Sequence, residues 1–103
     1  MIKVSVLYPK SNGSHFNMDY YCNKHIPMVQ QKLGAACKGT AVEEGLGGGA
    51  SGAEPSFVAM GHLYFDTVDT FQNAFGPHAD AVLADIPNYT NITPTIQVSS
   101  VRI

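Results

Sequence analysis

The segment Ser56–Phe65, SFVAMGHLYF, is apolar on both faces of the β-strand that it predicts. Side chains alternate between the two faces of a strand. One face would carry Phe57, Ala59, Gly61, Leu63 and Phe65. The other would carry Val58, Met60, His62 and Tyr64. A strand with two largely apolar faces is expected to be covered on both sides, and this requirement narrows the possible folds more than any other feature of the chain.

The elements around this strand predict an α+β fold. Alternation predicts a strand over residues 2–8, and a helix follows from an N-cap at Asn17 to about Leu33, with Gly34 as its C-terminal cap. A weaker strand is expected over residues 37–46. A second helix, capped by Asp66 and broken at Gly76-Pro77, runs to residue 85, and a last strand covers residues 95–103. The order β-α-β-β-α-β is typical of a ferredoxin-like layer with both helices on one face of an antiparallel sheet. We expect one domain over residues 1–103.

Two helices on one face leave the other face of the sheet bare. One interpretation is that His62 and Tyr64 tolerate water, since exposed apolar surface is common. The alternative is that the bare face packs against a second copy of the chain, and a closed two-fold dimer is the commonest arrangement of this kind. The sequence therefore predicts a homodimer.

Composition excludes several classes of protein. A net charge of −2 provides no basic patch for nucleic acid, and no apolar run reaches the roughly 18 residues of a membrane span. No signal peptide is visible at the N-terminus. Cys22 and Cys37 match neither a metal-binding spacing nor a disulfide framework, so we expect a cytoplasmic protein. The glycines in GLGGGASG do not join a strand to a helix, which indicates a flexible loop rather than a dinucleotide site.

The first predicted helix carries a histidine on its apolar side. At about 100° per residue, one stripe contains Met18, Tyr21, Cys22, His25, Val29 and Leu33. Pro27 lies on the opposite side, where it can bend the helix toward the sheet without entering the core. Tyr20 and Tyr21 cannot share one face, and Tyr21 is nearer the stripe.

Three roles are open to His25. It can be a buried imidazole that is hydrogen-bonded for structural reasons. It can be an acid/base or binding group in a cleft between helix and sheet, because its pKa lies near neutrality. It can also be a metal ligand, although the four histidines show no paired spacing. Cys22 lies three residues before His25, so a thiolate–imidazole pair is conceivable, but a small buried hydrophobe is the simpler interpretation of this cysteine.

Three stretches of the chain resemble the EthD family, which is associated with degradation of ethyl tert-butyl ether. They are MIKVSVLYP, MDYYCNKHIPMV and GHLYFDTVDTFQNAFGPHADAVLADIPNYTNITPTIQ, and together they cover most of the chain. The resemblance implies a dimeric α+β barrel, in which the sheet of a ferredoxin-like protomer pairs with that of its partner. It also places His25 at the histidine of the family's KH.P motif.

The resemblance leaves the reaction open. Similar proteins include isomerases, decarboxylases and cyclases that use a helix–sheet cleft without a metal or cofactor. It thus implies a protein of small-molecule catabolism that binds a small cyclic or aromatic compound; if the chain is an enzyme, it is a cofactor-independent isomerase or lyase. We expect His25 and Tyr21 as catalytic residues and a ligand-binding set of Met18, Cys22, Val29, His62 and Tyr64. The alternative is a non-catalytic accessory protein that supports a partner oxygenase in ether degradation. The substrate and any partner protein are not identified by the sequence.

Overall fold

The structure is a computed structural model that describes residues 1–103. Its centre is one antiparallel sheet of four strands in the order β2-β3-β1-β4. The strands are β1 (Ile2–Pro9), β2 (Gly39–Glu44), β3 (Phe57–Phe65) and β4 (Thr95–Ser100). Val4 of β1 lies opposite Leu63 of β3 and Val98 of β4. The alternating segments of the sequence therefore form the strands that they predict.

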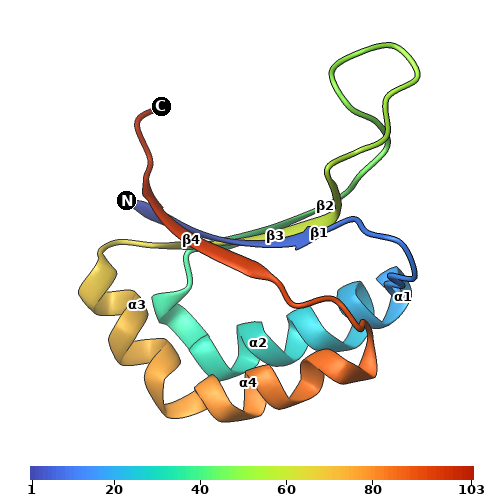
Figure 1. Ribbon diagram of the computed structural model, residues 1–103. Helices are drawn as coiled ribbons and strands as arrows, with labels where there is room; N and C mark the ends of the chain where they lie inside the picture. Colours follow the sequence, from blue (N-terminus) through green and yellow to red (C-terminus); the bar gives the residue numbers. More distant parts are fainter.

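Two helical segments cover one face of this sheet (Figure 1). The first comprises α1 (Met18–Tyr20), a π-helical turn (Tyr21–His25), α2 (Ile26–Leu33) and a 3₁₀ turn (Gly34–Ala36). The second comprises α3 (Val68–Phe75), a 3₁₀ turn (Gly76–His78), α4 (Ala79–Asp85) and a further 3₁₀ turn (Ile86–Asn88). The element order and the single covered face confirm the predicted ferredoxin-like α+β fold.

The helix ends follow ordinary capping chemistry, with one correction. The Asn17 side chain accepts a hydrogen bond from the Tyr20 backbone N–H at 3.0 Å, and Gly34 ends α2 with a φ of +60°, as predicted. Asp66 was the wrong choice of cap for α3. The cap is Thr67, whose hydroxyl accepts from the Thr70 N–H at 3.1 Å. Both residue types are good caps, and the one immediately before the first helical residue takes the role.

The first helical segment contains a π-helical turn just before Pro27. The Ile26 N–H bonds to the carbonyl of Tyr21, five residues back, and Pro27 itself is exposed to solvent. The extra residue in this turn changes the rotation that a regular helix would have. Cys22 is consequently exposed, although a regular helical period places it on the buried stripe. Single π-helical turns inside helices occur frequently at functional sites.

The core between sheet and helices has two parts. One is mainly aliphatic and lies around Val4, Val29 and Leu63, with Phe65 packed among them. The other is largely aromatic; it is formed by Tyr8, Tyr21, Ala59, Tyr89 and Ile92. Four aromatic side chains of the core are among the most completely buried in the protein: Tyr8, Tyr21, Phe65 and Tyr89. Three of them carry a hydroxyl group, so the aromatic part is a buried polar network as well as a core.

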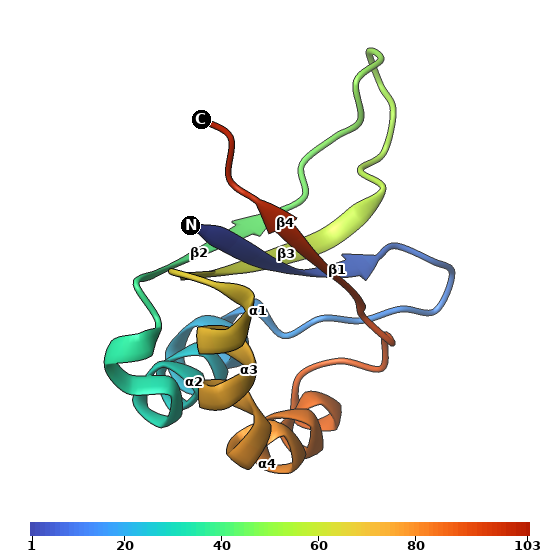
Figure 2. The same ribbon diagram turned by 90° about the vertical axis from the view of Figure 1, so that its left-hand side faces the viewer.

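The opposite face of the sheet has no helix on it. Met60, His62 and Tyr64 lie on this open face and are half-buried, whereas Ala59, Leu63 and Phe65 face the helices and are buried. Val58 was expected on the same face as Met60, but it lies at a register shift of the β1–β3 pairing and packs on the core cluster of Tyr8 and Ala59. The connection between β2 and β3, residues 45–56, projects from the sheet on its open side (Figures 1 and 2). It has no regular secondary structure, as its glycine content predicts, and it exposes 93% of Leu46.

Candidate functional site

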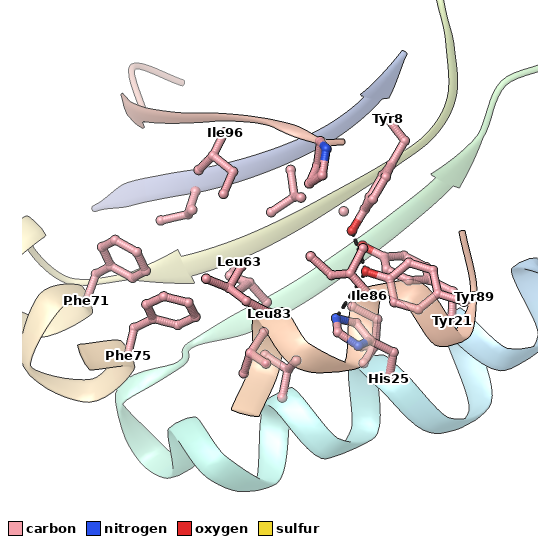
Figure 3. A pocket seen from close by; sticks show the side chains of 17 residues that line it. Tyr8, Tyr21, His25, Leu63, Phe71, Phe75, Leu83, Ile86, Tyr89 and Ile96 are labelled. Carbon is pink, nitrogen blue, oxygen red and sulfur yellow. Dashed lines mark hydrogen bonds between the residues drawn. The ribbon is translucent and has the colours of Figure 1, made fainter. Parts of the chain in front are cut away.

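A cavity of about 80 Å³ lies between the sheet and the two helical segments (Figure 3). Most of its lining is aliphatic or aromatic. Phe71 and Phe75 of α3 lie at one end, and Leu83 and Ile86 contribute from the second helical segment. The other end is different in character, because Tyr8, Tyr21, Tyr89 and His25 gather there. The cavity therefore has an apolar body and one end that can form hydrogen bonds.

A chain of hydrogen bonds joins the groups at the polar end. The hydroxyls of Tyr8 and Tyr89 are 2.7 Å apart, and the Tyr89 hydroxyl lies 3.4 Å from Nε2 of His25. The first distance is that of a good O–H···O bond, whereas the second is longer than a strong hydrogen bond. The contact at Nε2 of His25 is thus the weakest link in this series of hydrogen bonds, and Nε2 is the atom most open to a new partner.

The second nitrogen of His25 is held by a carboxylate. Nδ1 lies 2.8 Å from Oδ2 of Asp85, at the end of α4. An ionised carboxylate can only accept, so Nδ1 carries the ring proton and Nε2 presents a lone pair toward Tyr89. The Tyr20 hydroxyl donates to Oδ1 of Asp85 at 2.8 Å, and the Asn88 side-chain amide donates to the same atom at 2.9 Å. Asp85 is therefore fixed by three donors and in turn fixes the tautomer and orientation of His25.

Burial sets the charge of this pair. Desolvation lowers the pKa of His25 below its usual value, and the hydrogen bond and charge of Asp85 offset only part of that effect. For Asp85, burial acts to raise the pKa, but the hydrogen bonds from Asn88, His25 and Tyr20 outweigh it and hold the pKa low. At neutral pH the pair is therefore a neutral imidazole beside an ionised carboxylate, and this is the state in which a histidine can accept a proton.

The tyrosines at the cavity stay protonated. Burial is the largest cause that raises the pKa of Tyr8, Tyr21 and Tyr89 well above the ordinary value for a phenol. The pKa of Tyr20 is also raised, chiefly by its hydrogen bond to Asp85. All four hydroxyls are therefore hydrogen-bond donors at any ordinary pH.

Tyr21 and Gly61 are fitted to each other. The Tyr21 ring stacks on the His25 imidazole, with centroids 5.5 Å apart and an interplanar angle of 14°. Its hydroxyl reaches β3 at Gly61, where an added Cβ would overlap the phenolic oxygen. Because it has no side chain, Gly61 leaves room in the strand for the Tyr21 hydroxyl. Tyr21 in turn covers one face of the His25 ring.

The structure brings together only some of the residues that the sequence suggested. Tyr21, His25 and Val29 line the cavity. Met18 is half-buried and packs on the aromatic part of the core, but it does not line the cavity. Cys22 lies in the π-helical turn and is exposed to solvent, and the hydrogen-bond partners of His25 are Asp85 and Tyr89 rather than this thiol.

His62 and Tyr64 lie on the wrong face of the sheet for this cavity. They belong to the alternate residues of β3 that occupy the open face, whereas Gly61 and Leu63 face the cavity. His62 is held in its own hydrogen-bond array there: Nδ1 lies 2.9 Å from the Ser5 hydroxyl and Nε2 lies 2.7 Å from Oε1 of Glu43. The strand's parity was the open question in the sequence, and it separates these two residues from His25.

Sequence reasoning missed four polar residues of the site: Tyr8, Tyr20, Asp85 and Tyr89. Tyr8 shares the alternation of Ile2, Val4 and Val6, so its direction was available from the strand pattern. Asp85 ends α4 and Tyr89 follows it, some 60 residues from His25, and no local pattern links the two segments.

The histidine, cysteine, aspartate and glutamate side chains form no group of three or more that could hold a metal ion. None of the helices combines the length and the apolar character needed to cross a membrane.

Comparisons with known proteins agree with this architecture. The chain is similar to an EthD-like protein from Ralstonia eutropha JMP134, with 47% identity and a TM-score of 0.95 over 99% of this chain and 92% of that one. It also resembles an EthD family protein from Bacillus halodurans C-125, at 17% identity and a TM-score of 0.67 over 98% of both chains. A dimeric ferredoxin-like protein of unknown function from Thermobifida fusca YX has 19% identity and a TM-score of 0.58, over 97% of this chain and 90% of that one.

No curated protein sequence matches the chain significantly. The model of the EthD domain, however, matches residues 16–93. This range includes the π-helical turn with His25 and the end of α4 with Asp85, so the two segments that build the polar end of the cavity both lie within the match. The fold, the family model and the similar structures lead to one conclusion: the chain belongs to the EthD family.

Proposed function

We propose that this EthD family protein binds a small cyclic or aromatic compound in the cavity between helices and sheet and transfers a proton with His25, without a cofactor. The observation that carries the proposal is the Asp85–His25–Tyr89 array at the one polar end of an otherwise apolar cavity. A site of this kind, apolar with a few convergent polar groups, is the usual form of a small-molecule pocket. The reaction class is that of an isomerase or lyase.

The array has the parts that general base catalysis needs. The neutral imidazole presents Nε2 toward the cavity, and Asp85 at 2.8 Å would stabilise the imidazolium that forms when the ring takes a proton. The Asp85 side chain is 18% exposed, whereas that of His25 is 5% exposed. Asp85 therefore connects a base inside the protein with the edge of the solvent, where a proton can leave.

Binding of phenol, a small neutral aromatic compound, tests the proposal. In a titration followed by NMR, backbone amide signals of the cavity segments around Tyr21, His25 and Val29 should shift. The variant His25→Gln should weaken phenol binding at least tenfold while keeping a cooperative thermal melt, whereas His15→Gln, at an exposed position, should bind like the wild type. Shifts confined to the open face of the sheet, or none at all, would contradict a ligand site in the cavity and favour the accessory role beside a partner oxygenase.

We further propose that the protein is a homodimer that pairs through the open sheet face. Met60 and Tyr64 are apolar or aromatic and lie on that face without a covering helix. A related fold, from Thermobifida fusca YX, is described as dimeric. A second copy packed on this face would bury the second apolar side of β3.

The two free cysteines, Cys22 and Cys37, fit a reducing compartment and hence a cytoplasmic location.

A further inference from the structure

The lining of the cavity contains no charged partner for a ligand. Its titratable side chains are His25 and three tyrosines; no lysine, arginine, aspartate or glutamate belongs to it. His25 is neutral at pH 7, because burial lowers its pKa, and the tyrosines are protonated. An ionised ligand would therefore lose its hydration without gaining a counter-ion, which costs several kcal/mol. The lining thus selects an uncharged compound.

The polar end of the cavity offers a hydrogen-bond donor close to a base. The Tyr89 hydroxyl is 3.4 Å from Nε2 of His25 and 2.7 Å from the Tyr8 hydroxyl. In a carbonyl compound, the oxygen and the α-carbon are each bonded to the carbonyl carbon, so they lie about 2.4 Å apart. A ligand of this kind can place its oxygen at the hydroxyl pair while an α-C–H points at Nε2. The long Tyr89–His25 contact loses little when the ligand replaces it.

We propose, on the basis of the function proposed above, that the ligand is a neutral cyclic ketone whose carbonyl oxygen is received by the Tyr8–Tyr89 hydroxyl pair while His25 removes its α-proton. The Nε2 lone pair takes the proton and the C–H bond breaks. Its electron pair becomes the C=C bond of an enolate, and the C=O π electrons move to the oxygen. Tyr89 donates a hydrogen bond to this oxyanion and accepts one from Tyr8. Return of the proton from His25 to the same carbon completes an exchange or epimerisation there, and in a β,γ-unsaturated ketone its return to the γ-carbon completes a double-bond isomerisation, in both cases without any further reactant.

The hydroxyl pair is suited to this role because it is buried and already ordered. Donors that are fixed in a water-excluded site before reaction are worth more than donors in water. Burial also raises the pKa of both phenols, so they keep their protons and donate rather than ionise. The positive charge that His25 gains is balanced by Asp85 at 2.8 Å.

The size of the cavity points to a small ring. Its volume of about 80 Å³ is roughly half of the ~150 Å³ that holds benzene in an engineered apolar cavity. Leu83 and Ile96 line it from opposite sides, one from α4 and one from β4 (Figure 3), and they are 47% and 52% exposed. Rotation of two such exposed side chains can widen the cavity at little cost, so a five-membered ring is the appropriate first probe.

Deuterium exchange of cyclopentanone in D2O, followed by ¹H NMR, tests the inference. The wild-type protein should exchange the α-protons faster than buffer alone, and His25→Gln should lose this activity. Tyr89→Phe should slow exchange about a hundredfold, the usual effect of removing one oxyanion donor. The double variant Tyr8→Phe/Tyr89→Phe removes both members of the pair and provides a second test. His15→Gln, at an exposed position, should exchange at the wild-type rate.

The possible outcomes separate this inference from the function on which it rests. Exchange that depends on His25 but is unchanged in Tyr89→Phe and in the double variant would overturn the role of the hydroxyl pair and leave proton transfer by His25 intact. Tighter binding of cyclopentanecarboxylate than of cyclopentanone would overturn the neutral ligand class. Absence of any exchange above buffer would overturn both proposals. Loss of exchange in His25→Gln and in the Tyr89 variants, with cooperative melts retained, would support both.

Discussion

Replacement of Asp85 by asparagine should destabilise the fold by about 2 kcal/mol. The carboxylate accepts hydrogen bonds from Tyr20, His25 and Asn88 at 2.8, 2.8 and 2.9 Å. A hydrogen bond to a charged group contributes about 1.5–3 kcal/mol and a neutral one about 0.5–1.5 kcal/mol, so each conversion costs roughly 1 kcal/mol. The asparagine oxygen can keep the two bonds to Oδ1 as neutral ones, whereas its NH2 group cannot accept the bond from His25. Two conversions and one lost bond would together cost about 3–4 kcal/mol, and the partial exposure of Asp85 and Asn88 reduces this sum.

Chemical denaturation with urea, followed by circular dichroism, gives this difference directly, and the melting temperature should fall by about 10 °C. The matched control is Asp80→Asn, which removes an exposed carboxylate from the same helix and should change the unfolding free energy by less than about 0.5 kcal/mol. If Asp85→Asn were as stable as Asp80→Asn, the three hydrogen bonds would not hold the site together and the reasoning would be refuted.

Three other predictions concern packing, assembly and pH. Gly61→Ala should cost about 1–3 kcal/mol, the usual cost of overpacking, because its Cβ meets the Tyr21 hydroxyl; in a Tyr21→Phe background the cost should be clearly smaller, and equal costs in both backgrounds would refute this contact. Met60→Lys should convert a wild-type dimer into a monomer or an aggregate in sedimentation velocity, and a wild type that sediments as a monomer at micromolar concentration would overturn the dimer. The lowered pKa of His25 means that the unfolded state binds more protons below about pH 6.5. The contribution of the neutral His25 to the unfolding free energy is therefore complete above that pH and is lost as the pH falls toward the folded-state pKa. The unfolding free energies of wild type and His25→Gln, measured with urea between pH 7 and 5, should converge as the pH falls. Parallel curves would contradict a lowered pKa of His25.

Local patterns predicted the elements of the fold and one side of the site. Alternation identified the strands, and the helical stripe placed Tyr21, His25 and Val29 inward, because these features depend only on neighbouring residues. Cys22 was misplaced because a π-helical turn interrupts the regular period, and the sequence carries no plain mark of such a turn beyond the nearby Pro27.

The other side of the site depends on contacts between distant segments. His25 meets Asp85 across 60 residues and Tyr89 across 64, and Tyr8 meets Tyr89 across 81. The chain's topology brings these residues together by placing the first helical segment beside the second beneath β1. A residue's local pattern does not contain that information. The same limit applied to β3, where the pattern showed two apolar faces but not which of them the helices cover.

The tautomer and titration of His25 in the wild-type protein test the central claim most directly. Two-bond ¹H–¹⁵N NMR spectra distinguish a ring proton on Nδ1 from one on Nε2 and follow the imidazole through its pKa. The account predicts a neutral ring at pH 7 with its proton on Nδ1, facing Asp85, and a pKa below the ordinary value of about 6.5. A proton on Nε2, or a ring that is protonated at pH 7, would leave no lone pair directed at the cavity and would contradict His25 as its base.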